Sequence, residues 1–201
     1  MAERERVVIW QRVDTHGLEY CALAHSDAGG WTLGGTVVVT FEGRPAEARY
    51  EVVCDEQWQT KIAVVSLTMA GQQRTLRLAV DDERRWWADG QELSELQGCV
   101  DVDLGVTPST NTLPIRRLGL DTGARALVTA AWVRFPSLEV SPLVQRYTRL
   151  DAQHYRYESG AELEQGGEPA FTAELLVDDA GLVVDYGAIW QRVATEDVAE
   201  E

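Results

Sequence analysis

Short stretches of alternating polar and apolar residues, separated by turn sequences, constrain the fold of this chain more than any other feature. Such alternation predicts β-strands, because successive side chains of a strand point to opposite faces of a sheet. The clearest stretches are 6–13, 18–25, 31–42, 46–55 and 58–69. The intervening sequences, such as EGRP at 42–45 and MAGQ at 69–72, are typical of tight turns. This close spacing leaves no room for crossover helices and predicts an antiparallel sheet.

The same pattern continues to the C-terminus without a low-complexity linker. The further predicted strands are 74–80, 84–87, 100–104, 126–135, 138–140, 143–150, 154–158, 170–177 and 183–193. A length of 201 residues with 45% hydrophobic residues suits one domain with a sizeable core. We therefore expect one mainly β domain over residues 1–194, followed by an acidic tail, TEDVAEE, at 195–201.

One short segment has the signals of a helix. Thr112 can cap it, Pro114 is tolerated in the first turn, and Gly119 can adopt the left-handed conformation that ends a helix. Such a helix has about two turns and is marginal alone. A single short apolar helix beside a long antiparallel sheet suggests that the sheet curls around it.

Charge and cysteine content exclude several classes of partner. The formal net charge of −15 disfavours nucleic acid and anionic lipid surfaces. No apolar run reaches the ~18 residues of a membrane span, and the start, MAERERVVIW, does not have the pattern of a signal peptide. Cys21, Cys54 and Cys99 lie far apart within predicted strands, where free thiols are small buried apolar groups. We expect a soluble, cytoplasmic protein.

The sequence offers few signals of catalysis. Asp101 and Asp103 form a DVD triplet that resembles the metal-binding motif of glycosyltransferases, but those enzymes require a doubly wound α/β region. We favour two structural aspartates there and keep a second site as the alternative. The three histidines are isolated, and the glycine-rich GGWTLGGTVVV at 29–39 fits no phosphate loop and predicts a turn with bulges. The sequence predicts no catalytic residue, metal or cofactor.

Aromatic and basic residues are more suggestive. On one face of the predicted 143–158 hairpin, Tyr147 lies near Tyr155 and Tyr157. Amphipathic rings with nearby arginines suit sugars and lipid headgroups, although cross-strand pairing alone also explains them. Arginines outnumber acidic residues between positions 114 and 150, which indicates either an anion-facing wall or ordinary surface charges.

Four motifs resemble those of a known family. They are YEVVCDEQW at 50–58, DVDLGVTPSTNTLPIRRL at 101–118, VQRYTRLDAQHYRY at 144–157 and GLVVDYGAIWQRV at 181–193. In this order they resemble the signature of a bacterial family of unknown function labelled "putative glycolipid-binding". The resemblance implies a spiral β-roll, in which a long antiparallel sheet winds around one helix, and an amphiphilic ligand. It assigns no catalytic residue.

From these observations we expect a non-enzymatic protein that binds a glycolipid or another amphiphile in a cleft between sheet and helix. The expected ligand-binding residues are Asn111, Thr112, Arg116 and Arg117, followed by Arg134, Tyr147 and Tyr157. A structural alternative has Asn111 and Thr112 capping the helix while Arg116 pairs with Asp101 or Asp103. Two other functions stay open: an enzyme that uses Asp101, Asp103 and nearby arginines on a small polar substrate, and an interaction protein without a pocket.

Overall fold

A computed structural model describes residues 5–26 and 29–198, and its strands form one fifteen-stranded sheet. The first eight strands are β1 (Glu5–Arg12), β2 (Gly17–His25), β3 (Trp31–Phe41), β4 (Arg44–Cys54), β5 (Thr60–Met69), β6 (Gln72–Val80), β7 (Trp86–Ala88) and β8 (Gln91–Glu92). The others are β9 (Asp101–Leu104), β10 (Arg125–Val133), β11 (Val140–Arg149), β12 (His154–Ser159), β13 (Phe171–Val177), β14 (Val183–Tyr186) and β15 (Trp190–Val198). The helical elements are α1 (Thr112–Leu118) and three short 3₁₀ turns: η1 (Ser94–Leu96), η2 (Ser109–Asn111) and η3 (Ala161–Gln165).

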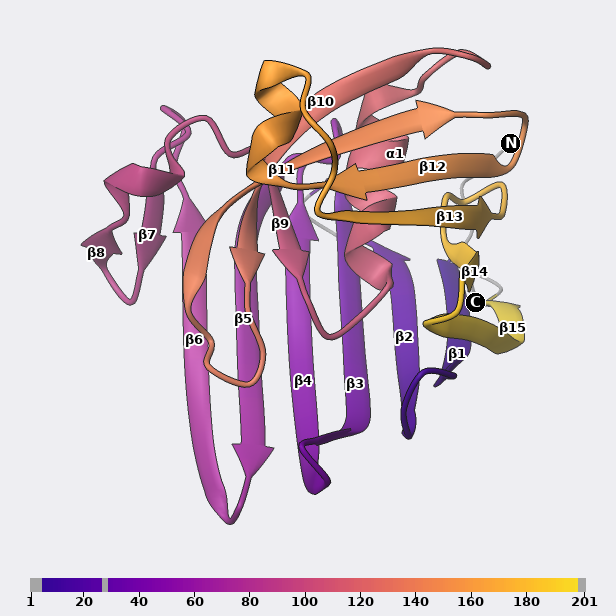
Figure 1. Cartoon of the computed structure of the whole chain (residues 1–201). Coiled ribbons are helices and arrows are strands. Elements are labelled where there is room, and N and C mark those ends of the chain that lie inside the picture. The colour runs from indigo at the N-terminus through magenta and orange to yellow at the C-terminus, as the bar shows by residue number, and fades with distance from the viewer. Residues whose placement is uncertain (1–4, 27–28, 199–201) are drawn as a thin grey trace.

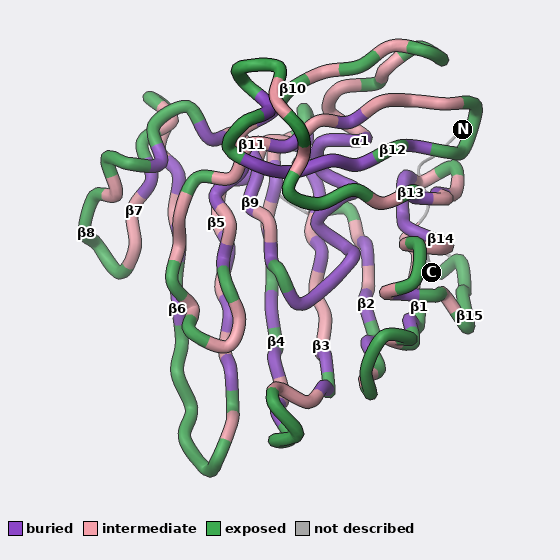
Figure 2. Tube along the Cα trace, in the orientation of Figure 1, coloured by how far each residue is buried: buried purple, intermediate pink, exposed green. Residues whose placement is uncertain are grey.

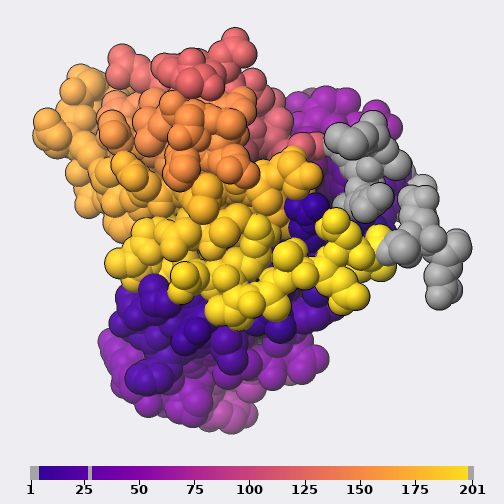
Figure 3. Space-filling model, turned by 90° about the vertical axis from the view of Figure 1, so that its right-hand side faces the viewer, coloured from indigo at the N-terminus to yellow at the C-terminus, as the bar shows by residue number. Residues whose placement is uncertain are grey.

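The strand order explains how one chain builds so large a sheet. The chain runs outward from β1 to β8 at one edge, passes to β9 at the other edge, continues through α1 to β10, and then returns strand by strand to β15. Strands β1 and β15 pair in the middle of the sheet and so join its two halves, with Trp10 opposite Arg192. The repeated pentapeptide IWQRV, at 9–13 and 189–193, lies almost entirely in these two paired strands. Figure 3 shows the C-terminal segment in yellow between the N-terminal strands in indigo and the β10–β13 region in orange.

The sheet encloses the helix, as the sequence predicts. Figure 1 shows β10–β13 crossing over the end of the β2–β6 layer, with α1 between them. Leu113 is fully buried and Ile115 nearly so. Gly119 ends the helix in the left-handed conformation, at φ 49°. Every residue from 106 to 115 is buried, and Figure 2 shows this purple path inside the fold.

Two features of the sheet differ from the sequence prediction. Strands β9 and β10 pair in parallel, because the chain between them passes through α1 and so makes a crossover connection. The single strand predicted over 183–193 is two strands, β14 and β15, separated by a turn at Gly187 with φ 51°. The predicted strands 138–140 and 143–150 are joined in β11.

The glycine-rich stretch 29–39 forms the predicted turn only at its start, where Gly29 and Gly30 precede β3 with φ 84° and 86°, whereas Gly34 and Gly35 form no bulge. Both lie inside β3, which pairs with β4 in one unbroken register. A Cβ on Gly35 would lie 2.5 Å from the ring of Tyr50, which is its partner across the strands. Glycine at this position therefore leaves room for the tyrosine ring to lie across β3 and reach Glu19 on β2.

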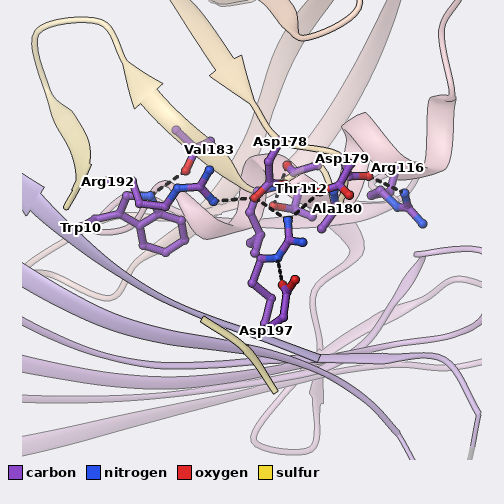
Figure 4. Close-up of polar contacts among 12 residues, drawn as sticks. Trp10, Thr112, Arg116, Asp178, Asp179, Ala180, Val183, Arg192 and Asp197 are labelled. Atoms are coloured by element: carbon purple, nitrogen blue, oxygen red, sulfur yellow. Dashed lines mark hydrogen bonds and ion pairs between the residues drawn. The ribbon is translucent and has the colours of Figure 1, made fainter. Parts of the chain in front are cut away.

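The turn between β13 and β14 fastens the central strands together. Asp178 accepts hydrogen bonds from the backbone of Ala180 and Leu182, both at 3.0 Å. Its carboxylate also pairs with Arg6 of β1 at 2.9 Å and with Arg192 of β15 at 2.5 Å (Figure 4). One carboxylate therefore shapes the turn and ties it to two strands.

The same turn holds the helix. Thr112 donates a hydrogen bond to the carbonyl of Gly181 at 3.1 Å, and Arg116 donates one to the carbonyl of Asp179 at 3.4 Å (Figure 4). Beside them, Trp10 Nε1 donates to the carbonyl of Val183 at 2.8 Å.

Two remaining expectations concern the termini and the cysteines. Residues 195–198, which the sequence analysis places in an acidic tail, continue strand β15, and 199–201 lie outside the described residues. The three cysteines are buried and free. No helix in the described part of the chain is long and apolar enough to cross a bilayer.

Candidate functional site

The segment between β9 and α1 is a compact polar corner inside the fold. Thr110 Oγ1 accepts a hydrogen bond from the backbone of Leu104 at 3.2 Å, and Thr107 Oγ1 accepts one from the backbone of Ser109 at 3.0 Å. The side-chain amide of Asn111 donates to the carbonyl of Pro108 at 3.1 Å. Side-chain bonds of this kind satisfy a buried irregular backbone. The corner therefore has a defined shape against which a cavity can form.

A cavity of about 460 Å³ lies between this corner and the strands that follow α1. This volume is within the range of small-molecule sites. The residues around it come from β1 and from nearly every element from β9 to β15. They are Arg12, Asp103, Gly105, Thr107, Asn111, Trp132, Leu143, Tyr157, Ser159, Gly160, Ala170, Phe171, Tyr186, Ile189 and Trp190. We call this cavity the aromatic pocket, because five of these side chains are aromatic.

Three of the aromatic rings form one wall of the pocket. The ring centroids of Tyr157, Phe171 and Tyr186 are 6.0 to 6.4 Å from each other. Tyr157 meets Tyr186 at 81°, an edge-to-face contact that aromatic pairs favour. Behind them, the ring of the fully buried Tyr147 lies 5.2 Å from that of Tyr157. These contacts hold the wall in a fixed geometry.

Asp103 is the acidic group of the pocket lining. Its Oδ2 accepts a hydrogen bond of 2.6 Å from the side-chain amide of Gln145. Burial raises the pKa of Asp103 to about 6, although the bond from Gln145 opposes this shift. The same burial, reinforced by the charge of Asp103, raises the pKa of Tyr186, so this phenol stays protonated.

A second buried carboxyl group lies behind the pocket. Glu19 Oε1 accepts hydrogen bonds from Tyr50 at 2.5 Å and from the pocket residue Thr107 at 2.6 Å. Burial raises the pKa of Glu19 to about 8, so the group is protonated at neutral pH. Its Oε2 has no hydrogen-bond partner among the described residues.

The structure brings some of the sequence-predicted site residues together at the pocket. Asn111 and Tyr157 line it, and so does Asp103, which the sequence analysis kept as an alternative. Tyr147 lies behind the lining and donates a hydrogen bond of 2.9 Å to Asn111 Oδ1. Thr112 is buried against Gly181. Neither Asn111 nor Thr112 caps the helix through its side chain, contrary to the structural alternative.

The three predicted arginines do not line the pocket. Arg117, and not Arg116 as expected, pairs with Asp101 through two bonds of 3.0 and 2.5 Å. Arg116 lies over the ring of Trp58, 5.1 Å from its centroid. Arg134 pairs with Glu139 at 2.9 Å on the surface.

The sequence does not predict most of the aromatic lining. Trp132, Phe171, Tyr186 and Trp190 lie on four different strands, far apart in the chain. Their only signal in the sequence is the high number of tryptophans and tyrosines, seven and six. In the described part of the chain, no group of three or more histidine, cysteine, aspartate or glutamate side chains is arranged to hold a metal ion.

Comparison with known proteins identifies the family. Residues 7–192 match the family described as "Putative glycolipid-binding". The chain belongs to this family. A crystal structure of a DUF1089 family protein from Pseudomonas aeruginosa has 37% sequence identity and a TM-score of 0.76, covering 87% of this chain and 92% of that one. Among curated proteins no sequence matches the chain.

A more distant structure supports the fold of this family member. A beta-barrel-like protein of the DUF1849 domain from Brucella abortus has a TM-score of 0.58 at 9% identity, with 98% of this chain and 99% of that chain covered. At this identity the likeness concerns the fold alone.

Proposed function

We propose that the protein binds an amphiphile, such as a glycolipid, and holds its polar headgroup in the aromatic pocket without chemical conversion. The family description supports this class of ligand. The observation that carries the proposal is the lining itself: five aromatic side chains surround a few converging polar groups. Aromatic faces pack on the C–H faces of sugars, while polar side chains bond the hydroxyls.

The polar contacts would come mainly from β9 and the corner that follows it. Asp103 lies in β9, Thr107 and Asn111 lie in the corner, and Ser159 lies on β12. Of the residues expected from sequence, we retain Asn111 and Tyr157 as headgroup contacts. Tyr147 orients Asn111 from behind, and Arg117 has a structural role with Asp101.

An apolar chain could leave the pocket past its apolar members. Leu143, Ala170 and Ile189 line the pocket beside the polar groups. Each methylene buried there would contribute about 0.8 kcal/mol, so even a short acyl segment would add measurable affinity. The headgroup then provides specificity and the chain provides affinity.

A second candidate function is general acid–base catalysis on a small polar substrate, which one observation favours. A carboxyl group with a pKa of about 6, such as that of Asp103, can exchange a proton near neutral pH. Glycoside hydrolysis, however, uses two carboxyl groups that flank the reacting bond. Asp103 is the one carboxylate among the described residues lining the pocket, and Asp101 is engaged by Arg117. The geometry therefore favours binding over hydrolysis.

The interaction-protein alternative predicts a fold without a pocket. A cavity of about 460 Å³ with converging polar groups argues against that alternative. We place the protein in the cytoplasm, because its three free thiols suit a reducing compartment.

Native mass spectrometry with organic extraction of co-purifying molecules tests the proposal. We expect a bound amphiphile, or its uptake from a bacterial lipid extract, with the extracted ligand chemically unchanged. Phe171→Ala opens the aromatic wall at a side chain that is already 39% exposed, so it should abolish binding while the protein stays folded. Val38→Ala, at a 55% exposed position of β3 that does not line the pocket, is the matched control.

The result has a clear contrary outcome. A mass without ligand after incubation with the lipid extract would refute the binding proposal. Recovery of a cleaved ligand would instead support the catalytic candidate.

A further inference from the structure

The two charged groups that line the aromatic pocket differ in whether they have an ion-pair partner. Among the described residues, two charged side chains line it, Arg12 and Asp103. Arg12 is already neutralised, because its guanidinium binds both carboxylate oxygens of Asp14, at 2.7 and 3.1 Å. Asp103 has no ion pair with any described basic residue, and its carboxylate accepts a hydrogen bond from the neutral amide of Gln145. The pocket therefore presents one carboxylate without a compensating cation.

The described groups around Asp103 include no cation that would neutralise its charge. The polar and titratable groups around it are Thr110, Gln145, Tyr147, Tyr157, Tyr186 and Asp101. The three tyrosines have pKa values raised by burial and remain neutral. Asp101 adds a further negative charge, although Arg117 binds it directly. A carboxylate can accept about four hydrogen bonds, so Asp103 can still accept one from a ligand.

The aromatic lining favours the same kind of ligand. The faces of aromatic rings carry partial negative charge and attract cations, most strongly when water is excluded. Arg134 already lies over the ring of Trp132 and Arg12 over that of Trp190, at 5.7 and 5.5 Å from the centroids. A ligand cation would therefore meet the rings of Tyr157, Phe171 and Tyr186. An anionic headgroup would be repelled by the charge of Asp103 and by the net charge of −15 of the protein.

We propose that the aromatic pocket selects a headgroup with a positively charged amine, such as an amino sugar, over neutral or anionic headgroups. The ammonium group would bind the carboxylate of Asp103 and lie against the aromatic rings, while the rest of the headgroup occupies the polar corner. This inference rests on the proposed binding function, since it names the ligand class of the same pocket.

Two ligands that differ in one substituent test the inference. Octyl 2-amino-2-deoxy-β-D-glucopyranoside and octyl β-D-glucopyranoside have the same ring and chain, but only the first has an amine. Isothermal titration calorimetry at pH 6.5, below the critical micelle concentrations, compares their affinities. We expect the amino glycoside to bind about tenfold more tightly, the effect of one charge-assisted hydrogen bond.

The preference should depend on the charge of Asp103. Asp103→Asn keeps the shape of the side chain and should remove the tenfold preference, while octyl glucoside affinity changes less than about twofold. Asp82→Asn changes the net charge equally at a fully exposed position and should leave the preference intact. In the unmutated protein the affinity for the amino glycoside should fall about fourfold from pH 6.5 to 5, because Asp103, with its pKa of about 6, then takes up a proton and the neutral form binds about tenfold less tightly.

The outcomes separate this inference from the proposed function. If octyl glucoside binds as tightly as the amino glycoside, or if Asp103→Asn retains the preference, the amine selectivity is refuted and the binding function stands. If neither glycoside binds, both are refuted.

Discussion

Replacing Arg117 by glutamine tests whether the basic end of α1 has a structural role. The Asp101 side chain is 1% exposed and that of Arg117 is 17% exposed, and two hydrogen bonds join them. Breaking a buried ion pair by removing one partner costs about 3–5 kcal/mol, because the other charge is left without compensation. Arg117 retains some contact with solvent, so we expect a loss near the lower limit, about 3 kcal/mol. In a chain of this length that loss lowers Tm by about 6–12 °C.

Arg116→Gln is the matched control on the same helix. Arg116 lies over Trp58 at 5.1 Å and has a weak bond to the Asp179 carbonyl. Contacts of this kind stabilise a protein by about 1 kcal/mol or less. The comparison of the two variants isolates the pair with Asp101, so the control variant should lose less stability than Arg117→Gln.

The cost of losing Arg117 should also depend on pH. Burial raises the pKa of Asp101 above its ordinary value while Arg117 opposes the shift, so removing Arg117 raises this pKa further. A carboxyl group whose pKa is higher in the folded than in the unfolded protein favours the folded state less as the pH rises. The free energy of unfolding therefore falls between the unfolded-state pKa and the folded-state pKa. The deficit of Arg117→Gln should accordingly be larger at pH 7 than at pH 5.

Urea unfolding at both pH values, followed by tryptophan fluorescence, measures these free energies. If Arg117→Gln lies within 1 kcal/mol of Arg116→Gln at pH 7, the structural interpretation of the pair is wrong. A deficit that does not change with pH would mean that Asp101 is not the charge left behind.

Three further perturbations test other buried contacts. Glu19→Gln should become progressively more stable relative to the parent from pH 5 to pH 8, as measured by urea unfolding. The reason is the folded-state pKa of about 8, which makes the parent lose up to about 1.4 kcal/mol of stability per pH unit over this range. Parallel pH profiles of the two proteins would contradict this. Tyr147→Phe leaves Asn111 Oδ1 without its donor and should cost about 1–2 kcal/mol, with a matching loss of pocket binding by calorimetry. Asp178→Ala removes the carboxylate that shapes the β13–β14 turn and should cost about 3 kcal/mol, which lowers Tm by about 6–12 °C, whereas an unchanged Tm would show that the turn needs no such tie.

The elements of this fold follow largely from local sequence. Most strands are correctly predicted, because alternation of buried and exposed side chains is a property of a few consecutive residues. The short helix and its end at Gly119 are also confirmed, since Pro114 and the left-handed glycine act locally. The errors occur where the signal is weak: Gly187 divides one predicted strand, and Gly34 and Gly35 continue a strand instead of breaking it.

The candidate site could be predicted only in part. Asn111 and Tyr157 stand out in sequence because they belong to unusual motifs, and both line the pocket. Trp132, Phe171 and Trp190 lie on ordinary alternating strands, and their convergence depends on how the sheet winds around the helix. No local pattern contains that information.

The DVD triplet separates what the sequence determines from what the tertiary structure determines. Alternation along a strand places Asp101 and Asp103 on one face, which the sequence alone determines. Tertiary packing gives the two carboxylates different partners. Asp101 meets Arg117 from the helix, whereas Asp103 meets the amide of Gln145 and opens onto the aromatic pocket. Sequence sets the direction of each side chain through local backbone geometry, but only the winding of a fifteen-stranded sheet decides which distant group each one meets.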